Sequence, residues 1–265
     1  MHYCRFQFQG QVQHGLVEFV AGTNQITHLL VNPPEESGSL QNITTKRIEP
    51  VHFSEATLLA PVRPSKIVCV GRNYRAHAAE MGGDVPKEPL IFFKPPSSLI
   101  ATGETIRRPK ASKNTHYEGE LGVVIAKPCY KLRAQADVRP YILGYTAVND
   151  ITARDLQKTD GQWTRAKGFD TFCPVGPLVT DEIDPWTGVD IETRVNGEIR
   201  QNGNTRDFVF SLDALIHYIS GIMTLLPGDL ISTGTPEGVG PFVAGDVLEV
   251  SVEGVGTLRN PASDE

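Results

Sequence analysis

Most apolar runs in this chain are short and stop at glycine or proline. The 265 residues include 25 glycines and 19 prolines, which favour tight turns between short strands. Strands are expected at residues 66–71, 89–94, 120–126, 141–150, 191–195, 229–233 and 246–252. Because strands outnumber helices and do not alternate regularly with them, the sequence predicts an α+β fold and not a doubly wound parallel sheet.

Helical patterns are confined to three segments. The clearest is residues 211–224, where apolar side chains recur at helical spacing. Residues 73–81 form a second predicted helix, because the glycines at 82 and 83 can end it. A third is expected at residues 152–158, directly after the strand that ends at Asp150.

Two prolines, Pro61 and Pro64, divide the chain. Before them, apolar and polar residues alternate around Phe6, Val12 and Phe19, which is typical of short strands. Each proline holds the preceding residue in an extended conformation, so no helix continues through this segment. We therefore predict a small β-rich N-terminal domain at residues 1–62 and a larger catalytic domain at residues 63–265.

Composition and charge argue against nucleic acid and membranes as binding partners. The formal net charge is -6 and no basic run is present, which argues against nucleic acid. The first residues lack the apolar core of a signal peptide, and no apolar run is long enough for a membrane span. The four cysteines form no CxxC pair. We expect a cytoplasmic protein with reduced thiols and no membrane or nucleic-acid partner.

Three carboxylates form the first candidate site. Glu118 and Glu120 are two residues apart at the start of a predicted strand, so they point to the same face. Asp150 ends another predicted strand. If this face is buried, the repelling charges need a cation, and hard oxygen ligands suit magnesium, manganese or calcium. Two solvated acids and a helix cap at Asp150 are the alternatives.

Other polar residues suit an anionic substrate. His77 and Glu80 are three apart on a predicted helix and could form a base with its orienting acid, although a surface ion pair has the same spacing. Arg154, Gln157 and Lys167 offer a planar fork, an amide and a point charge for an oxo acid. The alternative for these three is a solvated polar face.

Two glycine-containing loops resemble nucleotide-binding motifs only in part. Residues 71–74 follow a predicted strand but lack the second and third glycines of a dinucleotide fingerprint. Residues 234–240 lack the Gly-Lys-Ser/Thr ending of a P-loop. Neither loop predicts a bound nucleotide, although the hydroxyl of Thr235 could face a ligand. A plain turn is the default for the second loop.

Together these segments resemble the fumarylacetoacetate hydrolase family, over about residues 64 to 260. The matching stretches are Val70-Gly71-Arg72-Asn73-Tyr74 with His77, Phe93-Lys94-Pro95, Tyr117-Glu118-Gly119-Glu120-Leu121, Asp150-Ile151-Thr152-Ala153-Arg154-Asp155, Lys167-Gly168-Phe169-Asp170, Val195-Asn196-Gly197-Glu198 and Thr233-Gly234-Thr235-Pro236-Glu237-Gly238-Val239-Gly240. Several motifs in one order are far more specific than any single motif. The short N-terminal unit is similar to that of the compact bacterial members.

The resemblance implies a mixed β-sandwich roll, a homodimer, and a magnesium or manganese ion, for which calcium could substitute. It places the metal ligands at Glu118, Glu120 and Asp150. The implied substrate contacts are Arg72, Tyr74, Arg154, Gln157, Lys167 and Thr235. The implied catalytic residues are His77, Glu80 and Lys167, with His77 and Glu80 on a mobile segment that orders over the substrate in hydrolytic members.

These implications predict a metal-dependent hydrolase that cleaves a carbon–carbon bond in acylpyruvate-like 2,4-dioxo acids by stabilising an enolate. His77 with Glu80 would draw a proton from the attacking water. The alternatives are a decarboxylase or isomerase of oxaloacetate or 2-hydroxyhepta-2,4-diene-1,7-dioate-type diacids, and a non-enzymatic, metal-stabilised module that binds oxo acids. A nucleotide-dependent oxidoreductase built on residues 71–74 is a further alternative.

Overall fold

Strands dominate the computed structural model, which describes residues 1–20 and 22–265. The strands are β1 (His2–Phe8), β2 (Gln11–Val20), β3 (Thr23–Leu30), β4 (Thr45–His52), β5 (Thr57–Leu59), β6 (Ile67–Gly71), β7 (Leu90–Lys94), β8 (Leu99–Ile100), β9 (Ile106–Arg108), β10 (Thr115–Tyr117), β11 (Gly119–Ile125), β12 (Ile142–Asn149), β13 (Thr152–Ala153), β14 (Cys173–Thr180), β15 (Asp190–Val195), β16 (Glu198–Asn204), β17 (Leu230–Ser232), β18 (Gly240–Pro241), β19 (Val247–Val252) and β20 (Gly256–Asp264). The helices are α1 (Pro34–Ser37), α2 (Arg75–Glu80), α3 (Arg154–Thr159), α4 (Thr164–Lys167) and α5 (Leu212–Ile222).

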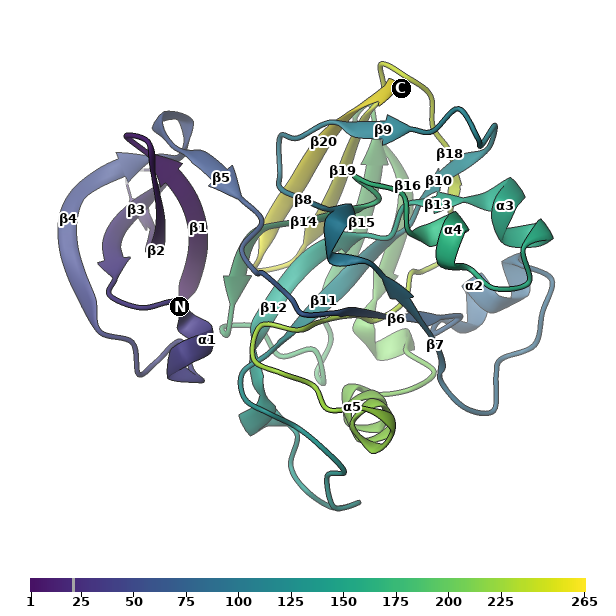
Figure 1. Cartoon of the computed structure of the whole chain (residues 1–265), viewed down its shortest axis with the longest axis horizontal. Helices are drawn as coiled ribbons and strands as arrows, with labels where there is room; N and C mark the ends of the chain where they lie inside the picture. Colours follow the sequence, from purple (N-terminus) through teal and green to yellow (C-terminus); the bar gives the residue numbers. More distant parts are fainter. Residues whose placement is uncertain (21) are drawn as a thin grey trace.

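The strands form two large sheets and one small one (Figure 1). The main sheet has the order β4-β3-β2-β1-β14-β12-β11-β17-β6-β7, and a second sheet has the order β16-β15-β19-β20-β9. Most pairs are antiparallel, but β17 pairs with β6 in parallel. The main core lies between these sheets and is closed by α5, because Leu121, Ile191 and Leu215 belong to one buried cluster. The predicted α+β class is confirmed.

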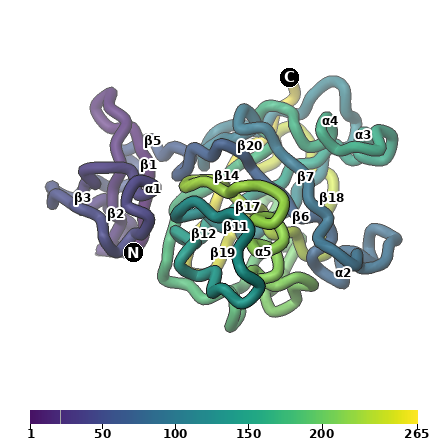
Figure 2. Tube along the Cα trace, turned by 60° about the horizontal axis from the view of Figure 1, so that its bottom comes forward, coloured from purple at the N-terminus to yellow at the C-terminus, as the bar shows by residue number. Residues whose placement is uncertain are grey.

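The N-terminal strands β1 to β4 lie to one side of the rest of the chain, as both views show (Figures 1 and 2). They still belong to the main sheet, because His2 and Tyr3 on β1 pair with Thr180 and Val179 on β14. The domain boundary between residues 62 and 63 stays a prediction. Among the described residues, no helix is both long and apolar enough to cross a membrane.

All three predicted helices exist, but each is shorter than expected. Helix α5 begins after Ser211, whose hydroxyl caps it by accepting a hydrogen bond from the amide of Ala214. Helix α2 begins only at Arg75, because the buried side chain of Asn73 is bonded to other loops. At the start of the third predicted helix, Thr152 instead pairs with His116 in a strand. Local periodicity could not reveal that long-range pairing.

The central pair of strands brings the candidate ligands together. Gly119 on β11 lies opposite Asn149 on β12, so residues 118 and 150 lie at the same end of the antiparallel pair. The amide of Asp150 donates to the carbonyl of Glu118 at 2.8 Å. Two segments that are distant in sequence therefore form one rigid edge.

Candidate metal centre

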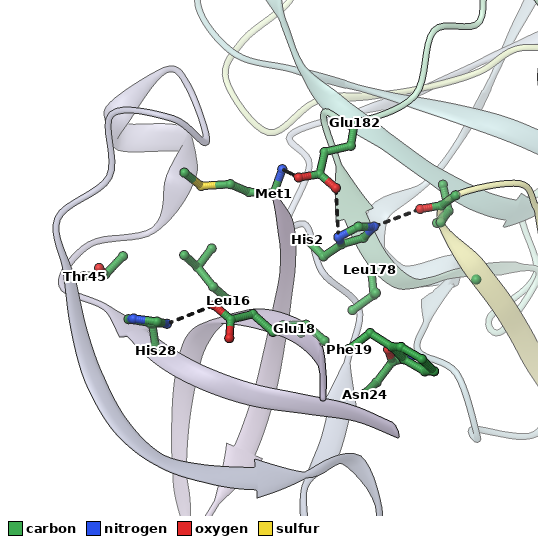
Figure 3. Close-up of a pocket in the computed structure, with 14 residues that line it drawn as sticks. Met1, His2, Leu16, Glu18, Phe19, Asn24, His28, Thr45, Leu178 and Glu182 are labelled. Carbon is green, nitrogen blue, oxygen red and sulfur yellow. Dashed lines mark hydrogen bonds and ion pairs between the residues drawn. The ribbon is translucent and has the colours of Figure 1, made fainter. Parts of the chain in front are cut away.

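A cavity of about 740 Å³ lies between the N-terminal strands and the turn that joins β19 to β20. The two acidic side chains that line it each lie beside a histidine: Glu182 is 3.5 Å from His2, and Glu18 is 3.9 Å from His28 (Figure 3). Among the described residues, no group of three potential metal ligands lies there. We therefore assign no catalytic or metal-binding role to this cavity.

A smaller cavity contains nearly all of the predicted site residues. It lies where β6 and β12 end and β11 begins, and residues of α2, α3 and α4 complete its lining. Its lining includes Arg72, His77, Glu118, Glu120, Asp150, Arg154, Gln157, Lys167 and Thr235. These residues, which the sequence predicts as site residues, therefore line one cavity.

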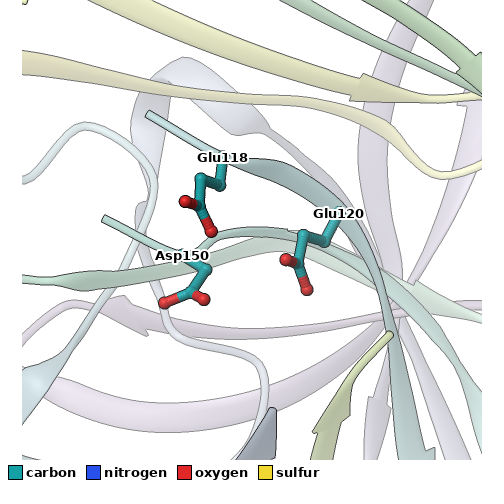
Figure 4. A group of neighbouring side chains, drawn as sticks. All are labelled: Glu118, Glu120 and Asp150. Atoms are coloured by element: carbon teal, nitrogen blue, oxygen red, sulfur yellow. The ribbon is translucent and has the colours of Figure 1, made fainter. Parts of the chain in front are cut away.

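Glu118, Glu120 and Asp150 converge in this cavity (Figure 4). One carboxylate oxygen from each lies within 4.8 Å of the others, and all three side chains are buried. Burial excludes the alternative of two solvated acids. The alternative role of Asp150 as a helix cap is also wrong, because the residue before α3 is Ala153 and no side chain caps that helix.

Three buried cations hold two of the carboxylates. Lys94 donates to one oxygen of Asp150 at 2.6 Å, and Lys167 donates to the other oxygen and to Glu118 at 2.8 Å. Arg154 donates to the second oxygen of Glu118. Burial opposes ionisation of Glu118, but the charges of Lys167 and Arg154 outweigh it and hold the pKa of Glu118 well below its usual range.

Glu120 differs because no cation touches it among the described residues. Its carboxylate accepts hydrogen bonds only from the Ser232 hydroxyl at 2.5 Å and the Gly234 amide at 2.9 Å. Burial, followed by the charge of Asp150, raises the pKa of Glu120 to about 8. A buried carboxylate beside two others, with no positive partner, fits a divalent cation. The residues present therefore fit a metal with hard oxygen ligands.

The carboxylate partners of Lys167 change its pKa more than its burial does. Desolvation lowers the pKa of this lysine, but the carboxylates of Asp150 and Glu118 more than compensate and raise it above the usual value. Lys167 is therefore a fixed positive charge at the edge of the carboxylate cluster. Arg154 is fixed as well, because it also donates to the Gln157 amide oxygen at 2.6 Å.

A closed ring of hydrogen bonds holds the backbone between the two glutamates. The amide of Gly119 donates to Gln201 at 2.9 Å, and Gln201 donates to the Thr235 hydroxyl at 2.7 Å. The Thr235 hydroxyl in turn donates to the carbonyl of Gly119 at 2.9 Å. Because its single proton is used in this ring, the hydroxyl of Thr235 can only accept a hydrogen bond from a ligand.

His77 and Glu80 form the predicted pair on α2. Nδ1 of His77 lies 3.0 Å from one Glu80 oxygen, and the other oxygen accepts from the amide of Gly238 at 3.0 Å. His77 is buried in the cavity wall, so the pair is not a solvated surface contact. The glutamate therefore connects the histidine to the loop that carries Thr235.

Residues 66–262 match the family described as fumarylacetoacetate (FAA) hydrolase C-terminal. The chain belongs to this family. Oxaloacetate tautomerase YisK of Bacillus subtilis is 40% identical to it in an alignment of length 257 that covers 92% of this chain and 82% of the relative. The predicted family and fold type are thus confirmed.

Solved structures in this family extend the comparison. 5-Carboxymethyl-2-hydroxymuconate delta-isomerase from Mycobacterium smegmatis has a TM-score of 0.90 and 39% identity, with 100% of each chain covered. Maleylpyruvate hydrolase from Sphingobium sp. SYK-6, in complex with manganese(II) and pyruvate, has a TM-score of 0.77 and 28% identity, with 100% of this chain and 99% of that chain covered. Relatives of this chain thus include a tautomerase, an isomerase and a hydrolase.

The sequence missed several residues of this fumarylacetoacetate hydrolase-type site. Lys94 belongs to a matching stretch of the sequence, but no local pattern there indicates that it is buried against Asp150. The apolar wall formed by Met81, Phe92 and Trp163 gave no signal. Conversely, Tyr74 is not among the residues that line the cavity; it is buried and packs against Phe208, with ring centroids 5.1 Å apart.

Proposed function

We propose that this protein is a divalent-metal-dependent enzyme that moves a proton at the carbon next to the keto group of a small 2-oxo acid. The observation that carries the proposal is Glu120, a buried carboxylate that lies beside two more carboxylates and has no cationic partner among the described residues. Magnesium or manganese suits this all-oxygen set. When bound, such an ion supplies Lewis-acid stabilisation of negative charge on a neighbouring substrate oxygen.

The protein's own groups have separate roles in this proposal. Lys167 and Arg154 keep positive charge beside the substrate oxygens. His77 accepts or returns the proton through Nε2, because Nδ1 is engaged by Glu80. Phe92 and Trp163, whose rings lie 5.2 Å apart, exclude water from one side of the cavity.

Two reactions use this chemistry. Tautomerisation moves a proton between the enol oxygen and C3, and isomerisation moves one to a carbon further along an unsaturated chain; two similar proteins carry such names. Hydrolysis of a carbon–carbon bond needs a base for water as well, and the His77–Glu80 pair supplies one. We propose tautomerisation or isomerisation first, and retain hydrolysis as the second candidate because of this pair.

The test compares substrates and variants in the presence of magnesium or manganese. Keto–enol interconversion of oxaloacetate and cleavage of acylpyruvates are both followed by ultraviolet absorbance. We expect His77→Gln to lower turnover about a hundredfold or more while metal binding survives. The matched control is His52→Gln, which changes a histidine far from the cavity.

Four outcomes of this test differ in meaning. Interconversion without cleavage supports the first candidate, and acylpyruvate cleavage supports the second. Tight metal binding without turnover of any oxo acid would contradict both candidates and favour the binding module. Unchanged turnover in His77→Gln would contradict the role of the histidine alone.

A further inference from the structure

The loop between β17 and β18 contacts α2 through one backbone amide. The N–H of Gly238 donates at 3.0 Å to the Glu80 oxygen that His77 does not contact. Among the described residues, this is the only hydrogen bond or ion pair that joins a residue of α2 to a segment outside residues 74–83. The position of α2 therefore depends on this bond and on the packing of its buried residues, His77 and Ala78.

Gly238 has a backbone conformation that only glycine adopts readily. Its φ is 94°, and a Cβ atom at this position would overlap the carbonyl oxygen of Arg200 on β16. The loop therefore lies directly against the backbone of β16. This close approach fixes the direction in which the Gly238 amide points.

Tyr117 holds the other side of the same residue. Its hydroxyl donates to the carbonyl of Gly238 at 3.1 Å, and its side chain is buried. The backbone of Tyr117 also pairs with Gly240, where β10 meets β18. One glycine thus connects Glu80, through its amide, to the residue that directly precedes the proposed metal ligand Glu118.

We propose that Gly238 and Tyr117 are positioning residues that dock α2, and that this docking keeps the His77–Glu80 pair at the wall of the carboxylate cavity. A carboxylate that accepts from a backbone amide makes a stronger hydrogen bond than a neutral acceptor does. The Glu80 side chain is nevertheless 33% exposed, so water competes for it once the amide is displaced. The effect on turnover rests on the proposed function, whereas the docking itself does not.

Hydrogen–deuterium exchange of the full chain, followed by mass spectrometry of peptides that contain α2, tests the docking without any substrate. Tyr117→Phe removes only the hydroxyl, and we expect α2 to exchange about three- to tenfold faster. Gly238→Ala displaces the loop and should have a larger effect. Tyr130→Phe, at an exposed tyrosine, is one control. Gly245→Ala is the other, because its φ is 93° but its Cβ would meet nothing within 4 Å.

Turnover of oxaloacetate with magnesium measures the consequence for the His77–Glu80 pair. We expect Tyr117→Phe to lower kcat about three- to tenfold while manganese affinity, measured by calorimetry, stays at the wild-type value. In a Glu80→Ala background the amide has lost its partner, so adding Tyr117→Phe should change neither kcat nor the exchange of α2. A role of Tyr117 in general stability would lower kcat in both backgrounds.

The outcomes separate the docking from the proposed function. Wild-type exchange of α2 in Tyr117→Phe, or an equal effect of Tyr117→Phe with and without Glu80, would overturn the docking, and this holds even where Gly238→Ala does not fold. Absence of turnover in the wild-type protein with every oxo acid would overturn the proposed function, and the exchange of α2 would still decide the docking.

Discussion

The hydroxyl proton of Thr235 is already donated in a hydrogen bond within the protein. The hydroxyl donates to the carbonyl of Gly119 and accepts from Gln201, which also donates to the carbonyl of Pro236 at 2.8 Å. Gly119 separates two of the three proposed metal ligands. Thr235 and Gln201 therefore act as positioning residues for Glu118 and Glu120, whatever else Thr235 contacts.

Replacing this hydroxyl tests its positioning role. Thr235→Val keeps the shape of the side chain but breaks the ring, so the two glutamates lose their fixed orientation. Groups that orient metal ligands typically contribute about 10–100-fold to metal affinity. We expect that loss in manganese titrations by calorimetry, whereas Thr235→Ser retains the hydroxyl and binds nearly as tightly as wild type. Equal affinity of the valine variant would refute the role.

At this scale the sequence predicted the cluster of carboxylates better than the groups that bond to it. Glu118 and Glu120 are visible as a pair because strand geometry fixes their common face. Lys94 lies 56 positions from Asp150, and Gln201 lies 82 positions from Gly119. No local pattern encodes such contacts, so they depended on the fold.

At the scale of elements, β11 packs unusually close to the second sheet. A Cβ atom at Gly119 would lie 2.0 Å from the Thr193 hydroxyl oxygen on β15 and 3.2 Å from a methyl group of Val250 on β19. Thr193 and Val250 are buried at the contact. The absence of a side chain at position 119 therefore lets the two sheets meet beside the proposed metal ligands.

A methyl group at this position should separate the sheets. We expect Gly119→Ala to lower the free energy of unfolding by about 1–3 kcal/mol, because neither neighbour is the far end of a flexible side chain. Gly221→Ala on α5 is the control: its Cβ would meet nothing within 4 Å, so stability should rise by up to about 1 kcal/mol. Urea unfolding measures both, and an alanine at 119 without cost would contradict the close packing.

Element boundaries were the weaker part of the prediction. The strands at residues 66–71 and 246–252 agree with β6 and β19 within one residue. Helix α2 is shorter than predicted because Arg72 has a left-handed backbone and the side chain of Asn73 makes buried hydrogen bonds to other loops. These long-range contacts override helical periodicity at this point.

For the whole molecule, one acid near the N-terminal strands should make stability depend on pH. Glu35 lies on α1, and its Oε2 atom is buried without a hydrogen-bond partner among the described residues. Burial raises the pKa of Glu35 above the usual value. The unfolded chain therefore releases this proton at a lower pH than the folded chain, and stability falls as pH rises through that interval.

Glu35→Gln should remove this loss. We expect the variant to be more stable than wild type at neutral pH, and the difference to vanish below about pH 4, where Glu35 is protonated in both states. Glu36→Gln, which changes an exposed acid of the same helix, is the control. Thermal unfolding at several pH values measures the effect. A glutamine variant no more stable than wild type at neutral pH would contradict it.

The homodimer predicted from the family stays a prediction, as does the cytoplasmic location. The fold of the whole molecule followed from the order of its motifs, whereas the reaction did not, because tautomerase, isomerase and hydrolase relatives share this fold. His77 and the apolar wall line the same cavity as the carboxylates, so we expect the outcome to depend on them.

The central claim is that a divalent ion at Glu118, Glu120 and Asp150 supports proton transfer at C3 of a 2-oxo acid. Proton NMR in D2O measures this step directly, as the exchange of C3 protons of oxaloacetate and 2-oxoglutarate for deuterium. With magnesium, we predict exchange well above the uncatalysed rate, lost on adding a chelator and in Glu120→Gln. Exchange at the uncatalysed rate, or exchange that survives both changes, would contradict the claim.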